Sequence, residues 1–109
     1  MNRAEYLAEV IRLYLQAPDT PQKASRSDWA IAAHFYSKEI PLENVAHTIR
    51  IASLRRHLRD TKLENLEPIH SLAYFRRVLD ALQPDALDPG YVQYVNLSYQ
   101  RCFGQQNRG

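Results

Sequence analysis

The sequence has little glycine and cysteine and no long apolar run, and each shortage excludes a class of function. Its three glycines all come late, so no glycine-rich loop can cradle a nucleotide phosphate in the first part of the chain. Cys102 is the only cysteine, which excludes an internal disulfide. No apolar stretch is long enough to span a bilayer, and the opening MNRAEYLAEV lacks the continuous apolar core of a secretion signal. We therefore expect a cytoplasmic protein with no membrane partner.

The sequence also lacks a catalytic or metal-binding constellation. No Gly-x-Ser-x-Gly motif is present, and Glu64 and Glu67, which form a carboxylate pair, stand in a polar link. Cys102 has apolar neighbours, which favours a buried thiol over a reactive one. A zinc site needs three or four convergent ligands, and no such spacing joins the four histidines, His34, His47, His57 and His70. We expect no enzyme activity, no bound metal and no cofactor.

What the sequence does contain is the composition of one folded domain. Its 109 residues are 45% hydrophobic and 24% charged, which is close to the average for globular proteins. We therefore expect residues 1–109 to form a single helical domain, with 104–109 as a frayed tail.

Apolar residues recur at helical spacing in the first half of the chain. Residues 4–17 place Leu7, Val10, Ile11 and Tyr14 on one face. A second helix is expected over 28–38, capped by Ser25 or Ser27. Its apolar residues surround most of the helix, which predicts burial over most of its circumference: Trp29, Ile31, Ala32, Ala33, Phe35 and Tyr36.

Three more helices follow. Pro41 predicts the start of a third helix that runs to about residue 58, because proline is tolerated in a first turn but not in a helix interior. Its expected inward side chains are Leu42, Val45, Ala46, Ile49, Ala52, Leu54 and Leu58. A fourth helix is expected to start at Pro68 or Ser71 and to end before Pro84. Its expected inward side chains are Leu72, Phe75, Leu79 and Leu82.

The last helix is expected over 89–102, with Asp88 as N-cap and Gly104 as C-cap. The segment YVQYVNLSY is also compatible with a strand, because it is rich in β-branched and aromatic residues. A lone strand would have no partner, so we predict helix. The fold class is thus all-α: a compact bundle of about five helices, in which the second and third form a helix-turn-helix-like pair around a corner at 38–40.

Positive charge is concentrated in the middle of the chain. Residues 46–77 hold three acidic side chains and seven basic ones, Arg50, Arg55, Arg56, Arg59, Lys62, Arg76 and Arg77. A cluster of this kind predicts contacts with the phosphates of DNA or RNA. The alternative is that the arginines are solvated and interact with the negative C-terminal end of the third helix. Glu43 and Asn44 occupy the N-terminal turn that reads bases in a helix-turn-helix, and Glu43 would repel phosphate.

Tyrosine is the second unusual feature, with seven tyrosines against three phenylalanines. Tyr91, Tyr94 and Tyr99 fall in the last helix and predict an interface with a protein partner, either a different chain or a second copy in a homodimer, because tyrosine is enriched at interfaces. Alternatively, these rings surround a small core and keep their hydroxyls in water.

Two segments stand out by their pattern: EIPLENVAHTIRIASLRR, residues 39–56, and LEPIHSLAYFRRVLDAL, residues 66–82. Together they resemble a family of short, uncharacterised bacterial proteins. Members of that family often accompany mobile-element and replication genes, and the second segment is more distantly similar to the helical end of replication-initiation primosome domains. The resemblance implies an all-helical fold and a bacterial origin. It carries no catalytic residue and marks Arg55, Arg56 and Ser71 only as motif members.

Two functions are therefore expected of a non-enzymatic protein. The first is a nucleic-acid-binding accessory protein that holds phosphates with the central basic residues. The alternative is a protein-interaction module that uses the tyrosine-rich last helix.

Overall fold

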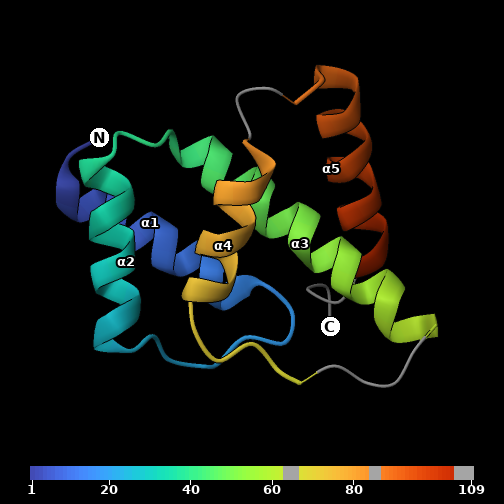
Figure 1. Cartoon of the computed structure of the whole chain (residues 1–109), viewed down its shortest axis with the longest axis horizontal. Coiled ribbons are helices and arrows are strands. Elements are labelled where there is room, and N and C mark those ends of the chain that lie inside the picture. The colour runs from blue at the N-terminus through green and yellow to red at the C-terminus, as the bar shows by residue number, and fades with distance from the viewer. Residues whose placement is uncertain (63–66, 84–86, 105–109) are drawn as a thin grey trace.

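The computed structural model describes residues 1–62, 67–83 and 87–104, apart from the side chains of 60–62. Within these ranges the chain forms five helices and no strand. They are α1 (Arg3–Gln16), α2 (Arg26–Ser37), α3 (Leu42–Lys62), α4 (Ala73–Leu82) and α5 (Pro89–Phe103). Figure 1 shows α3 running diagonally through the molecule, with α1 and α2 on one side and α5 on the other. The predicted all-α bundle is confirmed, and residues 91–99 are helical.

Side-chain caps fix where three of the helices begin. The Asn2 side chain accepts a hydrogen bond from the Glu5 amide at 2.8 Å, at the start of α1. Asp88 caps α5 in the same way, accepting from the Tyr91 amide at 3.1 Å, and Pro89 follows it as predicted. Of the two candidate serines before α2, Ser25 is the cap, because its hydroxyl accepts from the Asp28 amide at 3.2 Å.

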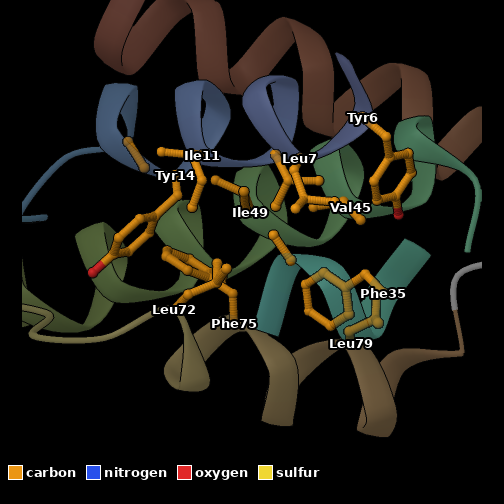
Figure 2. Close-up of a cluster of buried hydrophobic side chains, with 14 of the residues drawn as sticks. Tyr6, Leu7, Ile11, Tyr14, Phe35, Val45, Ile49, Leu72, Phe75 and Leu79 are labelled. Carbon is orange, nitrogen blue, oxygen red and sulfur yellow. The ribbon is translucent and has the colours of Figure 1, made fainter. Parts of the chain in front are cut away.

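The main core lies where α1, α2, α3 and α4 converge. Figure 2 shows side chains from these helices pointing into one cluster, among them Tyr14 and Phe75, whose rings meet edge to face at 6.0 Å. The stripes predicted for 4–17 and for the fourth helix account for much of this cluster. Its buried members are Tyr6, Leu7, Val10, Ile11, Tyr14, Ala17, Ala32, Phe35, Val45, Ile49, Ala52, Ile69, Leu72, Phe75 and Leu79.

A buried carboxylate joins two helix starts beside this core. Asp28 is 1% exposed, and its carboxylate accepts from the Ser25 amide and from the Leu72 amide, both at 2.9 Å. The second bond caps the start of α4, where Leu72 occupies the N-cap position and makes no side-chain cap of its own. Ser71, one of the two predicted starts of this helix, lies two residues before it, and its hydroxyl accepts from the Ala73 amide at 3.1 Å. One side chain of α2 therefore stabilises the first turns of both α2 and α4.

A second, smaller core attaches α5 to α3. Its buried residues are Ile51, Leu54 and Val95, and partly buried side chains surround them: Leu82, Leu87, Tyr99, Cys102 and Phe103. The extensive helix contacts of α5 are with α3, whereas α3 also packs against α1 and α4. The last helix is therefore held mainly along one side, and much of its remaining surface faces solvent (Figure 1).

The corner between α2 and α3 is a Schellman motif built without glycine. The Ile40 amide donates to the Phe35 carbonyl at 3.1 Å, and the Glu39 amide donates to the Tyr36 carbonyl at 3.0 Å. Glu39 occupies the left-handed position with φ of 57°. The helix-turn-helix-like pairing is not confirmed, because α2 packs mainly against α1 and makes a smaller contact with α4.

Several predictions of burial were wrong. Trp29 is 42% exposed and Tyr36 is 36% exposed, so α2 is not buried around most of its circumference. The reason is that α2 lies at the edge of the bundle, and only one stripe of it, with Ala32 and Phe35, faces the core. Leu58 is 58% exposed, because α3 continues past the core to Lys62. Pro84, Glu64 and the predicted tail beyond Gly104 lie outside the described residues.

Candidate binding surface

The side chain of Arg56, a member of the predicted basic cluster, is largely buried. Its guanidinium donates to the Glu67 carbonyl at 2.8 Å, lies 3.4 Å from an Asp19 carboxylate oxygen and stands 5.5 Å from the centre of the Tyr74 ring. The side chain is 11% exposed, against 61% for Asp19. Arg56 thus ties α3 to the loops before α2 and α4. It has an intramolecular role, and we leave it out of the candidate surface.

Arg50 is also engaged within the chain. Its guanidinium donates to the Asn96 side-chain oxygen at 3.2 Å, which links α3 to α5. The residue is half-buried and borders a shallow hollow together with Asn96, Leu97, Tyr99, Gln100 and Gly104. Arg50 is therefore partly accessible, but at a different hollow from the one that Arg55 lines.

The remaining predicted arginines are exposed: Arg55 and Arg59 on α3, and Arg76 and Arg77 on α4. None of the four forms an ion pair or a side-chain hydrogen bond with another described residue. Lys62 ends α3, and its side chain lies outside the described residues. The sequence-predicted cluster therefore divides into two engaged arginines, four exposed ones and one lysine whose side chain is not described.

The three predicted interface tyrosines divide in a similar way. Tyr91 and Tyr94 are 38% and 65% exposed. Tyr99 is half-buried in the second core and packs on Phe103, with ring centres 4.9 Å apart. Burial raises the pKa of Tyr99, and the positive charge of Arg50 partly opposes this rise. Tyr91 and Tyr94 are thus available to a partner, while Tyr99 mainly holds α5 in place.

A groove of about 250 Å³ runs between α3 and α5. Residues at i, i+3, i+4 and i+7 of α3 form one wall: Ile51, Leu54, Arg55 and Leu58. The other wall follows similar spacing on α5: Tyr91, Tyr94, Val95, Ser98, Arg101 and Cys102. Ile51, Leu54 and Val95 are buried and form an apolar floor. Two rows of side chains at helical spacing that face each other in this way leave space for apolar side chains of a third element.

The groove is positively charged as well as apolar. Arg55 and Arg101 are exposed and line it from opposite walls, and none of the ten described residues that line it carries a carboxylate. The sequence prediction missed Arg101, Leu58 and Cys102 as members of this surface. The spacing of 91, 94, 98 and 101 in the last helix was the available signal for Arg101, since it continues the stripe of Tyr91 and Tyr94 by about two turns.

The groove is small, and one thiol lies in its wall. Among the residues that the structure covers, no group of three or more histidine, cysteine and carboxylate side chains is placed to hold a metal ion. Its volume falls below the range of about 300–1,000 Å³ that is typical of small-molecule sites. Cys102 is a free, half-buried thiol in the groove wall. Within the described ranges, no helix is long and apolar enough to cross a membrane.

Comparison of the chain with protein-family models, curated proteins and solved structures finds no significant match. The resemblance to a bacterial family drawn from residues 39–56 and 66–82 therefore stays a prediction.

Proposed function

We propose that this chain is a non-enzymatic interaction module that binds a protein partner in the groove between α3 and α5. The observation that carries the proposal is the exposure of large apolar side chains around that groove. Leu58 is 58% exposed and Tyr94 is 65% exposed, although both stand beside an apolar floor. Tyr91 borders the same groove, and Leu97 is exposed on the same helix. A cluster of exposed apolar residues rimmed by charged ones is typical of a protein interface.

The proposal is tested by affinity capture. Variants of the chain are immobilised, and the proteins that each one retains from an extract of the organism that encodes the chain are compared. Leu58→Ser combined with Tyr94→Ser removes two exposed apolar groups of the groove and leaves both cores intact. Trp29→Ser combined with Tyr36→Ser is the control, since these two large side chains are also exposed but lie on α2, away from the groove. We expect partners that the wild type and the α2 variant retain and the groove variant loses. If the groove variant retains the same proteins as the wild type, the proposal is wrong.

Nucleic-acid binding is the second candidate, and one observation favours it. Arg55, Arg59, Arg76 and Arg77 are exposed and make no ion pair with a described residue, so their charge is available to phosphate. This candidate places the phosphate contacts on α3 and α4 and does not use the apolar floor of the groove.

The second candidate is tested by fluorescence anisotropy with single-stranded and duplex oligonucleotides over a range of salt concentrations. It predicts binding that weakens steeply with salt and falls in Arg55→Ala combined with Arg59→Ala. Arg3→Ala combined with Arg26→Ala removes the same charge from other helices and should bind as the wild type does. If neither oligonucleotide binds at low salt, this candidate is eliminated.

A further inference from the structure

We infer that the partner element in the α3–α5 groove is an amphipathic helix with acidic residues beside its apolar stripe. This inference rests on the proposed function, and it names the chemistry of the partner. It follows from two features of the groove: the helical spacing of both walls and the sign of the charge along its edges.

The shape of the groove favours a helix over an extended segment. Both walls are helices, and each presents residues one turn apart: Ile51, Leu54 and Leu58 on α3, and Tyr91, Tyr94 and Ser98 on α5. An extended peptide gains affinity by hydrogen bonding to an open sheet edge, and the described part of the chain contains no strand to offer one. A third helix satisfies its own backbone and needs only apolar side chains at i, i+3, i+4 and i+7 to fill the groove.

The positive charge of the groove favours acidic residues beside the apolar stripe of that helix. Arg55 and Arg101 stand on opposite walls, and Arg59 follows Arg55 by one turn on α3. The rings of His57 and Phe103 are in contact at 5.3 Å, so the C-terminal ends of α3 and α5 are adjacent and the three arginines belong to that end. A helix that enters with glutamate or aspartate at this end meets opposite charge on both sides.

The same charge argues against a second copy of this chain as the occupant. In a two-fold dimer whose axis passes beside Arg55 and Arg101, these residues of one copy would face the same residues of the other. Like charges placed together at an interface oppose association. Asp88, the carboxylate at the other end of α5, already caps that helix. An acidic partner helix avoids this repulsion.

The test is a selection from a displayed library of helical peptides. Each peptide has 15 residues, which is the length of α5, and all of its solvent-exposed positions are randomised. The full chain is the target, and a parallel selection uses Arg55→Glu combined with Arg101→Glu. We expect wild-type binders to carry apolar residues at helical spacing flanked by Asp and Glu. The charge-reversed target should select Lys and Arg, and it should bind the wild-type binders on the order of ten-fold more weakly at low salt.

The site of binding is read from Cys102, the only thiol of the chain. A peptide seated in the groove should slow the reaction of this thiol with a maleimide, and a peptide bound elsewhere should not. Leu58→Ser combined with Tyr94→Ser should weaken the same peptides, whereas Trp29→Ser combined with Tyr36→Ser should not.

Three results would overturn the inference. The first is groove-bound peptides with no excess of acidic residues, or no groove-bound peptide at all. The second is a concentration-dependent dimer in sedimentation that Arg55→Glu combined with Arg101→Glu strengthens or leaves unchanged. The third is an oligonucleotide that protects Cys102 and competes with the peptides. If partners from the cell still depend on Leu58 and Tyr94 in the first case, the proposed function stands and only the acidic helix is wrong.

Discussion

Replacing Asp28 by alanine should destabilise the protein more than removing an exposed carboxylate, because two helix starts share this acceptor. The carboxylate accepts from the amides of Ser25 and Leu72 at 2.9 Å, and both Asp28 and Leu72 are fully buried. Asp28→Ala leaves both donors without their acceptor. A hydrogen bond to a charged group contributes about 1.5–3 kcal/mol, so the loss of two should cost about 3–6 kcal/mol. This is a large part of the ~5–15 kcal/mol by which a small domain is stable.

Urea unfolding followed by circular dichroism measures this loss. Asp28→Asn should cost less, about 1.5–3 kcal/mol, because one acceptor oxygen remains for one of the two amides. Asp80→Ala is the control, since that carboxylate is exposed on α4, and it should change the free energy of unfolding by less than about 0.5 kcal/mol. A loss below about 1 kcal/mol for Asp28→Ala would show that the shared cap does not hold α4 in place.

Three further predictions concern stability, and the first two use the same unfolding measurement. Arg56→Ala should lower the free energy of unfolding by about 2–4 kcal/mol, because its guanidinium is largely buried and hydrogen-bonded. Arg55→Ala, which removes an exposed side chain, should lower it by less than about 0.5 kcal/mol. Equal losses in the two variants would refute the distinction. Glu39→Gly should raise the free energy of unfolding by about 0.5–1 kcal/mol, because glycine adopts the positive φ of this position without strain. A lower free energy of unfolding in this variant would refute the prediction. Burial raises the pKa of Tyr6 and of Tyr14 to about 12 from 10, so their contribution to stability is complete below pH 10 and is lost as pH rises from 10 to 12. Absorbance titration that gives an ordinary pKa for all tyrosines would contradict this.

A fourth prediction concerns the hydroxyl of Tyr14. The group is buried and forms no hydrogen bond with any residue that the structure describes, and the nearby charge of Asp28 adds to the rise of its pKa. Tyr14→Phe removes an unpaired polar group and keeps the edge-to-face contact with Phe75. We expect a gain of up to about 1 kcal/mol in the free energy of unfolding. A loss of more than about 1 kcal/mol in urea unfolding would mean that the hydroxyl has a partner.

The sequence predicted the elements of the fold well because their signals are local. Asp88 and Pro89 mark the start of α5, and the structure places a capped helix there. The exposure of Trp29 could not be predicted in the same way, because apolar residues cover most of α2 and only the positions of α1 and α4 decide which stripe is buried. Composition does not reveal that α2 lies at the edge of the bundle.

The candidate site depended on contacts between residues distant in the sequence. Arg56 looks like Arg55 in the chain, yet it is engaged because Asp19 and Glu67 approach it from two separate loops. The groove needs α5 to lie along the C-terminal half of α3, and no local pattern fixes that arrangement. The tyrosine stripe of the last helix was visible in the sequence, but the wall that faces it was not.

The most direct test of the central claim is amide hydrogen exchange of the full chain with and without a partner retained by the wild type. Binding in the groove predicts slower exchange in α5 and in the C-terminal half of α3, with no change in α1 and α2. Protection of α1 and α2 with unchanged exchange in α5 would contradict the account, because the partner would then bind on the opposite side of α3.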